Sequence, residues 1–122
     1  MCGILGLVSK QKSDVTKNYN KIIKDLFSLS DSRGKEASGF ASVDGKNIIT
    51  HKTPLSAKDM ISSKFFKEHF RNYKNSSNDI FTTIGHSRLV TDGYEHDNNN
   101  NQPVSRKKVH AIHNGIIVNI DN

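Results

Sequence analysis

The residue best suited to catalysis is Cys2, the single cysteine of this 122-residue chain. If Met1 is removed, a thiol and a free α-amine sit on the same residue. An α-amine has a reference pKa of about 8 and can act as a general base, and a thiolate is a strong nucleophile. Cys2 therefore fits an N-terminal nucleophile that is activated by its own amine. A small buried cysteine at the start of a strand is the alternative interpretation.

Three further segments carry residue types that catalysis uses. They are residues 33–39 (RGKEASG), 85–93 (GHSRLVTDG) and 113–119 (HNGIIVN). Taken singly, each has a plain structural explanation: a glycine turn, a strand that ends in a polar turn, and an Asn-Gly hairpin between apolar runs. Their order along one chain, behind a cysteine at position 2, favours a catalytic interpretation.

Together these segments resemble the class II glutamine amidotransferase domain of the N-terminal nucleophile hydrolases. The resemblance rests on Cys-Gly-Ile at 2–4, Arg-Gly at 33–34, Gly-His-Ser-Arg at 85–88 and His-Asn-Gly at 113–115, with Asn-Gln-Pro at 101–103 in support. It runs from residue 2 to residue 119, so residues 1–122 are expected to form the N-terminal part of one glutaminase domain. The fold that the resemblance implies is α+β, a four-layer αββα sandwich of two antiparallel sheets.

The resemblance also implies catalytic roles. Cys2 would attack the side-chain amide of glutamine, with its α-amine as the proton shuttle. Asn114, through its side-chain amide, and Gly115, through its backbone N–H, would donate to the oxyanion of the tetrahedral intermediate. One such donor typically lowers the barrier by about 3–4 kcal/mol.

Substrate binding would fall to other matched positions. Arg88 matches the arginine that holds the glutamine α-carboxylate, a group that a planar guanidinium can bind in bidentate fashion. Thr91 matches a residue that lines the same pocket. Arg33 and Gly34 match a turn beside the nucleophile and are expected to position it.

The implied function is release of ammonia from glutamine, passed to an acceptor synthase domain or subunit. Glutamine and that acceptor are the expected partners, and self-association into a homo-oligomer is left open. Two alternatives remain: a catalytically silent domain of the same fold that binds glutamine or another protein, and an α+β binding protein whose motifs are coincidental.

Several positions depart from the family pattern. Glu36 stands where Asp is usual, and Leu89 and Asp92 replace the aromatic residue and the histidine of the hexosamine-forming branch. Family members also carry an acidic residue well beyond His-Asn-Gly that binds the substrate α-amino group. Asp121 follows Gly115 too closely to take that role, so the chain is expected to be a fragment or an unusually truncated form of the domain, and its activity by itself is left open.

Composition narrows the remaining classes. Lys and Arg number 18 against 12 Asp and Glu, a net charge of +6, but the excess is mostly lysine and scattered, so no nucleic-acid partner is expected. A single cysteine excludes an internal disulfide. No apolar run approaches a membrane span, and with no targeting segment the cytoplasm is the default compartment.

The histidines predict no metal site. His110 and His113 lie three apart on an expected strand, where they point to opposite faces. Adding His86, His96 or Asp97 gives no recognised ligand spacing. Neither a metal nor another cofactor is expected.

The strands that must position the site follow from apolar patterning. Residues 4–8 predict a short buried strand, and residues 80–84 predict a β-branched one. Residues 38–43 and 47–52 flank Asp44-Gly45, a strong hairpin signal. Residues 109–120 predict a strand, an Asn-Gly turn and a second strand.

Helices and loops complete the expected organisation. A helix is predicted from Ser13 or Asp14 to about Leu29. Ser56 and Asp59 form a capping-box signal for a second helix that continues toward Tyr73. Residues 30–34, 75–78 and 93–108 are predicted loops.

Overall fold

At one end of the main sheet, segments that are far apart in the sequence lie side by side. The structure is a computed structural model that describes residues 1–10, 14–71, 73, 80–91 and 93–115. Four antiparallel strands run in the order β1-β4-β2-β3, with bounds β1 Gly3–Lys10, β2 Ala37–Asp44, β3 Asn47–Thr53 and β4 Ile80–Arg88. Gly3 pairs with Ser87 and Ala37 with Arg88, so the start of β1, the start of β2 and the end of β4 coincide.

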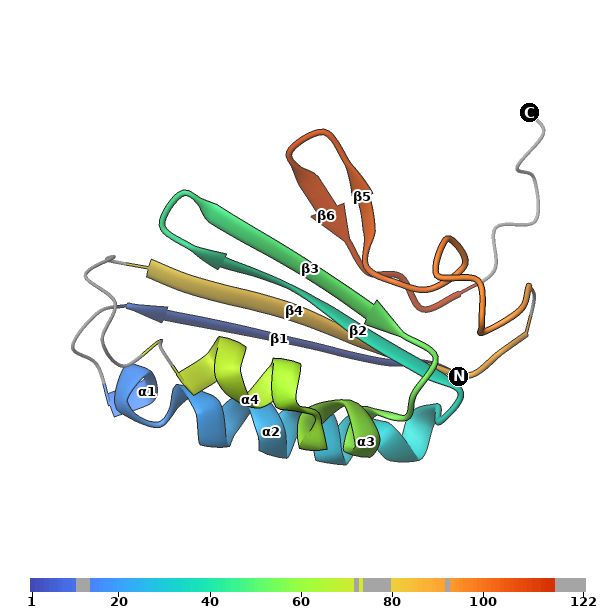
Figure 1. Cartoon of the computed structure of the whole chain (residues 1–122), viewed down its shortest axis with the longest axis horizontal. Coiled ribbons are helices and arrows are strands. Elements are labelled where there is room, and N and C mark those ends of the chain that lie inside the picture. Colours follow the sequence, from blue (N-terminus) through green and yellow to red (C-terminus); the bar gives the residue numbers. More distant parts are fainter. Residues whose placement is uncertain (11–13, 72, 74–79, 92, 116–122) are drawn as a thin grey trace.

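Helices cover one face of this sheet (Figure 1). They are α1 Asp14–Lys17, α2 Tyr19–Ser30, the 3-10 turn η1 Asp31–Arg33, α3 Ala57–Ser62 and α4 Lys64–Arg71. The core between the two layers is aromatic and almost fully buried, and its large members are Tyr19, Ile23, Phe27, Phe40, Met60, Phe66, Phe70, Tyr73 and Phe81. The hydroxyl of Tyr19 is satisfied there by Thr83 at 2.9 Å, as a buried phenol requires.

Each of the two predicted helices is divided. The first breaks at Asn18 into α1 and α2, and the second breaks at Ser63 into α3 and α4. Ser63 marks the second break because its extended backbone ends α3 while its hydroxyl accepts the N–H of Phe66. The predicted Ser56 cap is confirmed, since its hydroxyl accepts the N–H of Asp59 at 3.1 Å.

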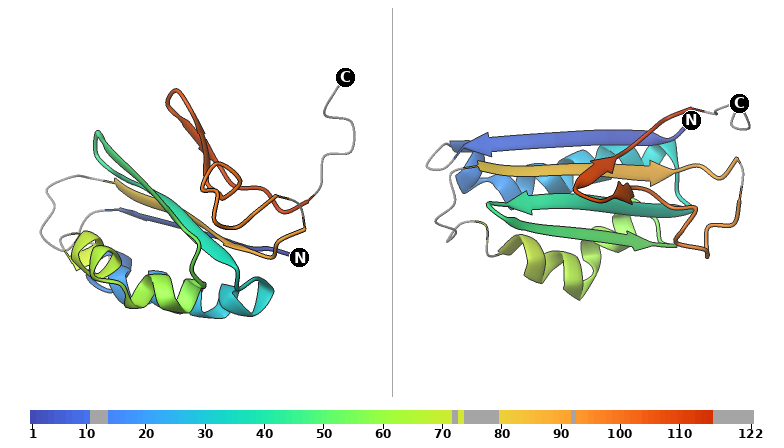
Figure 2. Two further views of the ribbon diagram at one scale, coloured as in Figure 1. Left: turned by 45° about the vertical axis from the view of Figure 1, so that its right-hand side comes forward. Right: turned by 90° about the horizontal axis from the view of Figure 1, so that it is seen from above.

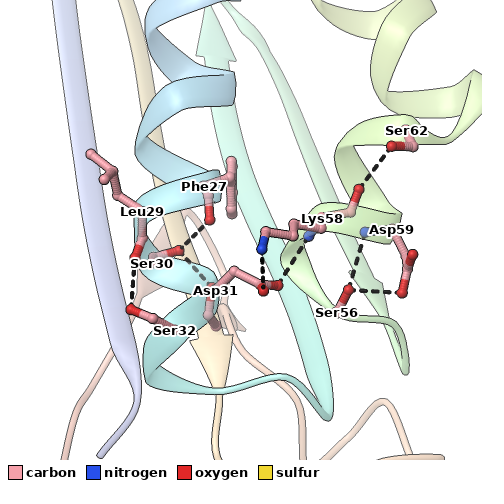
Figure 3. Close-up of polar contacts among 10 residues, drawn as sticks. Phe27, Leu29, Ser30, Asp31, Ser32, Ser56, Lys58, Asp59 and Ser62 are labelled. Carbon is pink, nitrogen blue, oxygen red and sulfur yellow. Dashed lines mark hydrogen bonds and ion pairs between the residues drawn. The ribbon is translucent and has the colours of Figure 1, made fainter.

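A buried carboxylate joins α3 to the end of α2. Figure 3 shows Asp31 reaching the start of α3, where it accepts the backbone N–H of Lys58 at 3.1 Å and meets Lys58 Nζ at 3.7 Å. Nearby, Ser30 Oγ lies 2.6 Å from Ser87 Oγ on β4. These contacts fix η1, and therefore Arg33 and Gly34, against the sheet edge where β1 begins.

A second, two-stranded antiparallel sheet lies over the other face (Figure 2). Its strands are β5 Val104–Arg106 and β6 Val109–Ala111. Lys52 Nζ donates to the carbonyl of Asn101 at 3.0 Å and Thr50 contacts His110 at 3.2 Å, so polar side chains of β3 hold this layer. The prediction of a continuous loop over 93–108 is wrong at Val104–Arg106. These residues form β5, which pairs with β6 across a turn at Lys107.

The fold is α+β with two antiparallel sheets, which confirms that part of the sequence prediction. The described residues stack in the order helices, four-stranded sheet, two-stranded sheet (Figure 1). The fourth, helical layer stays a prediction. The strand expected after Asn114-Gly115, Asp92, Asp121 and the expected loop at 75–78 fall outside the described residues. No helix in the described part of the chain has both the length and the apolar character needed to cross a membrane.

Candidate active site

Cys2 and Asn114 meet at the edge of the main sheet. The backbone nitrogen of Cys2 donates to Asn114 Oδ1 at 3.1 Å. This contact orients the amide of Asn114, because a peptide N–H can only donate and must face the oxygen. The nitrogen concerned becomes the α-amine of Cys2 when Met1 is removed.

The sulfur of Cys2 lies against the end of β4. The N–H of Leu89 points to Sγ at 3.4 Å, and Sγ lies 3.6 Å from the carbonyl oxygen of Leu89. Both contacts involve one residue that directly follows β4, so the antiparallel β1–β4 pairing sets the position of the thiol. The side chain is half-buried and accessible from solvent.

Gly34 allows the turn after η1 to press against the same strand end. A Cβ at this position would lie 2.3 Å from the carbonyl carbon of Arg88 and 2.4 Å from the nitrogen of Leu89. These are rigid backbone atoms, so a larger residue would displace the strand end that contacts the thiol. Arg33, beside it, is exposed, and its Nη2 lies 3.9 Å from the sulfur of Met1.

One pocket borders Cys2, and a second borders Met1 and Leu89 beside it. One, of about 350 Å³, is lined by Cys2, Asn114 and Arg33 together with residues of β1 and α2. The other, of about 410 Å³, is lined by Met1, Leu89 and residues 32–36. Pockets that hold small molecules usually measure about 300–1,000 Å³, so either one is large enough.

Arg88 is buried on the face of β4 opposite the helices. Its Nη1 donates to Asn101 Oδ1 at 2.8 Å and to the carbonyl of Tyr94 at 3.3 Å, and its Nη2 donates to the carbonyl of Gly93 at 3.4 Å. The loop after β4 therefore fixes the plane of the guanidinium. The side chain is close in sequence to the Leu89–Cys2 contact but is not among the residues that line the Cys2 pocket.

The structure thus gathers some of the expected site residues and not others. Cys2, Asn114, Arg33 and Gly34 lie together at the sheet edge. Thr91 is exposed and lines neither flanking pocket, and Gly115 directly follows Asn114. Among the described residues, no group of three or more His, Cys, Asp or Glu could hold a metal ion.

Curated proteins match almost the whole chain. Glutamine–fructose-6-phosphate aminotransferase (isomerizing) of Sulfolobus acidocaldarius is 34% identical over 120 residues, which is 98% of this chain and 18% of that protein. Amidophosphoribosyltransferase of Methanocaldococcus jannaschii is 33% identical over 124 residues, 99% of this chain and 24% of that protein. The same-named protein of Methanothermobacter thermautotrophicus is 30% identical over 122 residues, 97% of this chain and 23% of that protein.

These homologues are class II glutamine amidotransferases, and the matches cover almost the full length of this chain. It spans about a fifth to a quarter of the length of these relatives. No protein-family model matches the chain, and no solved structure matches it significantly. The homology to this family agrees with the motif resemblance at residues 2–4, 33–39, 85–93 and 113–115.

Sequence reasoning missed two polar residues that support the site. Asn101 is 1% exposed and binds the Arg88 guanidinium, and Gln102 binds the backbone of His113, next to Asn114. The signal was the Asn-Gln-Pro segment, which the sequence marks as family-like without showing what it contacts.

His86 is a third buried polar residue whose environment the sequence did not reveal. It is 1% exposed, and neither ring nitrogen has a hydrogen-bond partner among the described residues. Burial lowers the pKa of His86 to about 4, and the charges of Arg88 and His113 act in the same direction, while the nearby His113 backbone opposes the shift in part. The ring is therefore neutral at pH 7.

Proposed function

We propose that this chain is a glutaminase domain that hydrolyses the side-chain amide of glutamine through a thioester on Cys2 and supplies ammonia to an acceptor synthase domain or subunit. The observation that carries the proposal is the 3.1 Å contact from the Cys2 nitrogen to Asn114 Oδ1. It joins the future α-amine and the amide expected to donate to the oxyanion, while the thiol of the same cysteine borders a pocket.

The reaction uses the two functional groups of one residue. After Met1 is removed, the α-amine of Cys2 takes the thiol proton and the thiolate attacks the amide carbon of glutamine. The carbonyl oxygen becomes an oxyanion between Asn114 Nδ2 and the N–H of Gly115. The intermediate then collapses as the C–N bond breaks, and the ammonium form of the amine returns its proton to the leaving ammonia.

Hydrolysis of the thioester completes the cycle. The amine, now neutral, takes a proton from a water molecule that attacks the thioester carbon. A second oxyanion forms in the same place and collapses with cleavage of the C–S bond. Glutamate leaves, and the amine returns its proton to the thiolate, which regenerates the starting state.

Arg88 and Thr91 form the proposed subsite for the glutamine α-carboxylate. Asn101 and the carbonyls of Gly93 and Tyr94 orient the guanidinium, which limits the entropy lost when it binds a planar anion. Arg33 and Gly34 position the turn beside the thiol.

The proposal includes the four-layer αββα arrangement for the complete domain. Ile4 and Val8 of β1 are 54% and 67% exposed on the face that carries β5 and β6, and Ile80 of β4 is 56% exposed there. A larger second sheet would bury these apolar side chains, each worth about 1.5–3 kcal/mol when fully covered.

One experiment tests the proposal directly. The chain is assayed for glutamate formed from glutamine, and its intact mass reports whether Met1 is removed. The proposal predicts turnover by the processed protein and none by Cys2→Ala. A processed protein that binds glutamine without hydrolysing it would show a silent glutamine-binding domain and would overturn the proposal.

A further inference from the structure

The side chain of Gln102 binds both backbone polar groups of His113, in the segment that carries Asn114. Its Nε2 donates to the carbonyl oxygen of His113 at 3.0 Å, and its Oε1 accepts the backbone N–H of the same residue. The amide thus satisfies both polar groups of one residue, as a neighbouring strand would. His113 lies beyond the last residue of β6 and is not part of the β5–β6 ladder.

The backbone of Gln102 is itself anchored to the main sheet. A Cβ at Gly39 on β2 would lie 2.2 Å from the Gln102 carbonyl oxygen, so the two backbones are in direct contact. The preceding residue, Asn101, is 1% exposed, and its carbonyl accepts Lys52 Nζ from β3 at 3.0 Å. The backbone from which the Gln102 side chain extends is therefore held against the main sheet.

His113, which Gln102 binds, immediately precedes Asn114, the residue that contacts Cys2. Asn114 reaches the Cys2 nitrogen at 3.1 Å from a segment that forms no described strand. With β6 ending at Ala111, the two hydrogen bonds from Gln102 hold this segment just before Asn114. A shift of the His113 peptide moves Asn114 and Gly115 with it.

We propose that Gln102 is a positioning residue for the two oxyanion donors, acting through the backbone of His113. The inference rests on the proposed function and adds to it a residue that touches neither substrate nor thiol. Donors that act on charge developed only in the transition state affect kcat, whereas uniform substrate binding affects KM. A misplacement of about 1 Å can lower a rate about 100-fold.

The test uses Gln102→Ala, which removes both hydrogen bonds, and Gln102→Glu, which keeps the acceptor but sets a carboxylate against the His113 carbonyl. Asn99→Ala is the matched control, because that residue lies in the same loop with an exposed side chain. We expect kcat for glutamine hydrolysis to fall about 10–100-fold in both Gln102 variants, with KM within about threefold of wild type. Exchange of the His113 amide hydrogen should accelerate in Gln102→Ala and less in Gln102→Glu, and Asn99→Ala should change neither quantity.

The outcomes separate this inference from the proposed function. A wild-type chain that does not hydrolyse glutamine overturns both. An active wild type in which Gln102→Ala leaves kcat unchanged, or raises only KM, overturns the positioning role alone. If exchange of the His113 amide hydrogen is unaltered in Gln102→Ala, the Gln102 side chain does not hold the His113 backbone, and the inference is equally wrong.

Discussion

The side-chain oxygen of Asn114 accepts a hydrogen bond from the backbone nitrogen of Cys2 at 3.1 Å, across 112 positions of sequence. In the chain with Met1 attached, this nitrogen is a peptide nitrogen. Once Met1 is removed it becomes an α-amine that keeps the same neighbour. The contact therefore already positions the nitrogen that is proposed to act as the base while Met1 is still attached.

The first prediction concerns the nucleophile. Cys2→Ser keeps the small polar side chain and the α-amine but replaces the thiol with a far weaker nucleophile. We expect glutamine hydrolysis to fall by more than about 10³-fold, by analogy with loss of a covalent nucleophile elsewhere. Glutamate release is the measurement, and intact mass must confirm that Met1 is removed from the variant. A Cys2→Ala variant within tenfold of wild type would exclude Cys2 as the nucleophile.

The second prediction concerns the side-chain amide of Asn114 as an oxyanion donor. Asn114→Ala removes the side-chain amide, and loss of one such donor typically costs about 10²–10³ in kcat. KM should change little, because the donor acts on charge that appears only in the transition state. Asn99→Ala, at an exposed asparagine on the 93–101 loop, serves as the control and should leave kcat unchanged. An effect confined to KM would assign Asn114 to substrate binding.

The third prediction concerns the anionic end of the substrate. Arg88→Lys keeps the charge but cannot reproduce a bidentate contact, so KM for glutamine should rise at least about tenfold. Arg106→Lys, an exposed arginine on β5, is the matched control. Because Arg88 is buried, circular dichroism must first show that the variant is folded. An unchanged KM in a folded variant, with a raised KM in Arg33→Lys, would move the carboxylate subsite to Arg33.

The fourth prediction compares two glycines. Gly34→Ala places a Cβ within 2.5 Å of backbone atoms of Arg88 and Leu89, and overpacking of this kind costs about 1–3 kcal/mol of unfolding free energy. At Gly6 the nearest atom to an added Cβ is the Thr83 carbonyl oxygen at 3.9 Å, so Gly6→Ala should be neutral or slightly stabilising. Urea unfolding measures both. Equal destabilisation of the two variants would contradict the close approach at Gly34.

The fifth prediction is a pH dependence of stability from His86. The unfolded ring binds a proton near pH 6.5, whereas burial lowers the folded pKa to about 4, so the unfolded state binds more protons between these values. Stability is therefore full above about pH 6.5 and falls as the pH drops toward 4, by up to about 3 kcal/mol from this residue.

Variants can isolate that contribution. The pKa values of His51 and His69 are also lowered by burial, so the wild-type slope has several sources. His86→Gln should flatten the loss of unfolding free energy between pH 7 and pH 5, whereas His96→Gln, at an exposed side chain, should not. An unaltered slope in His86→Gln would mean that this ring is not buried in the neutral form.

Local sequence predicted the elements of the fold well where a pattern is repeated or a signal is short-range. The Asp44-Gly45 hairpin, the Ser56 cap and the apolar strand at the N-terminus all depend on neighbours within a few residues. The prediction that this strand is buried is wrong, because residues 4–8 are exposed or half-buried. The breaks at Asn18 and Ser63 were not predicted, because the apolar periodicity continues across both. The strand at Val104–Arg106 was missed because three exposed residues carry too little pattern to distinguish a strand from a loop.

For the site, the sequence by itself determined which chemistry is available: one cysteine at position 2, an Asn-Gly pair at 114–115 and the ordered motifs whose family the relatives share. Only the tertiary structure decided how these residues meet. It put Leu89 on the thiol, buried Arg88 against Asn101, and brought Gln102 to the backbone of His113. These contacts depend on antiparallel register and on backbone packing at Gly34 and Gly39, which join residues far apart in the chain, and no local periodicity encodes such distances.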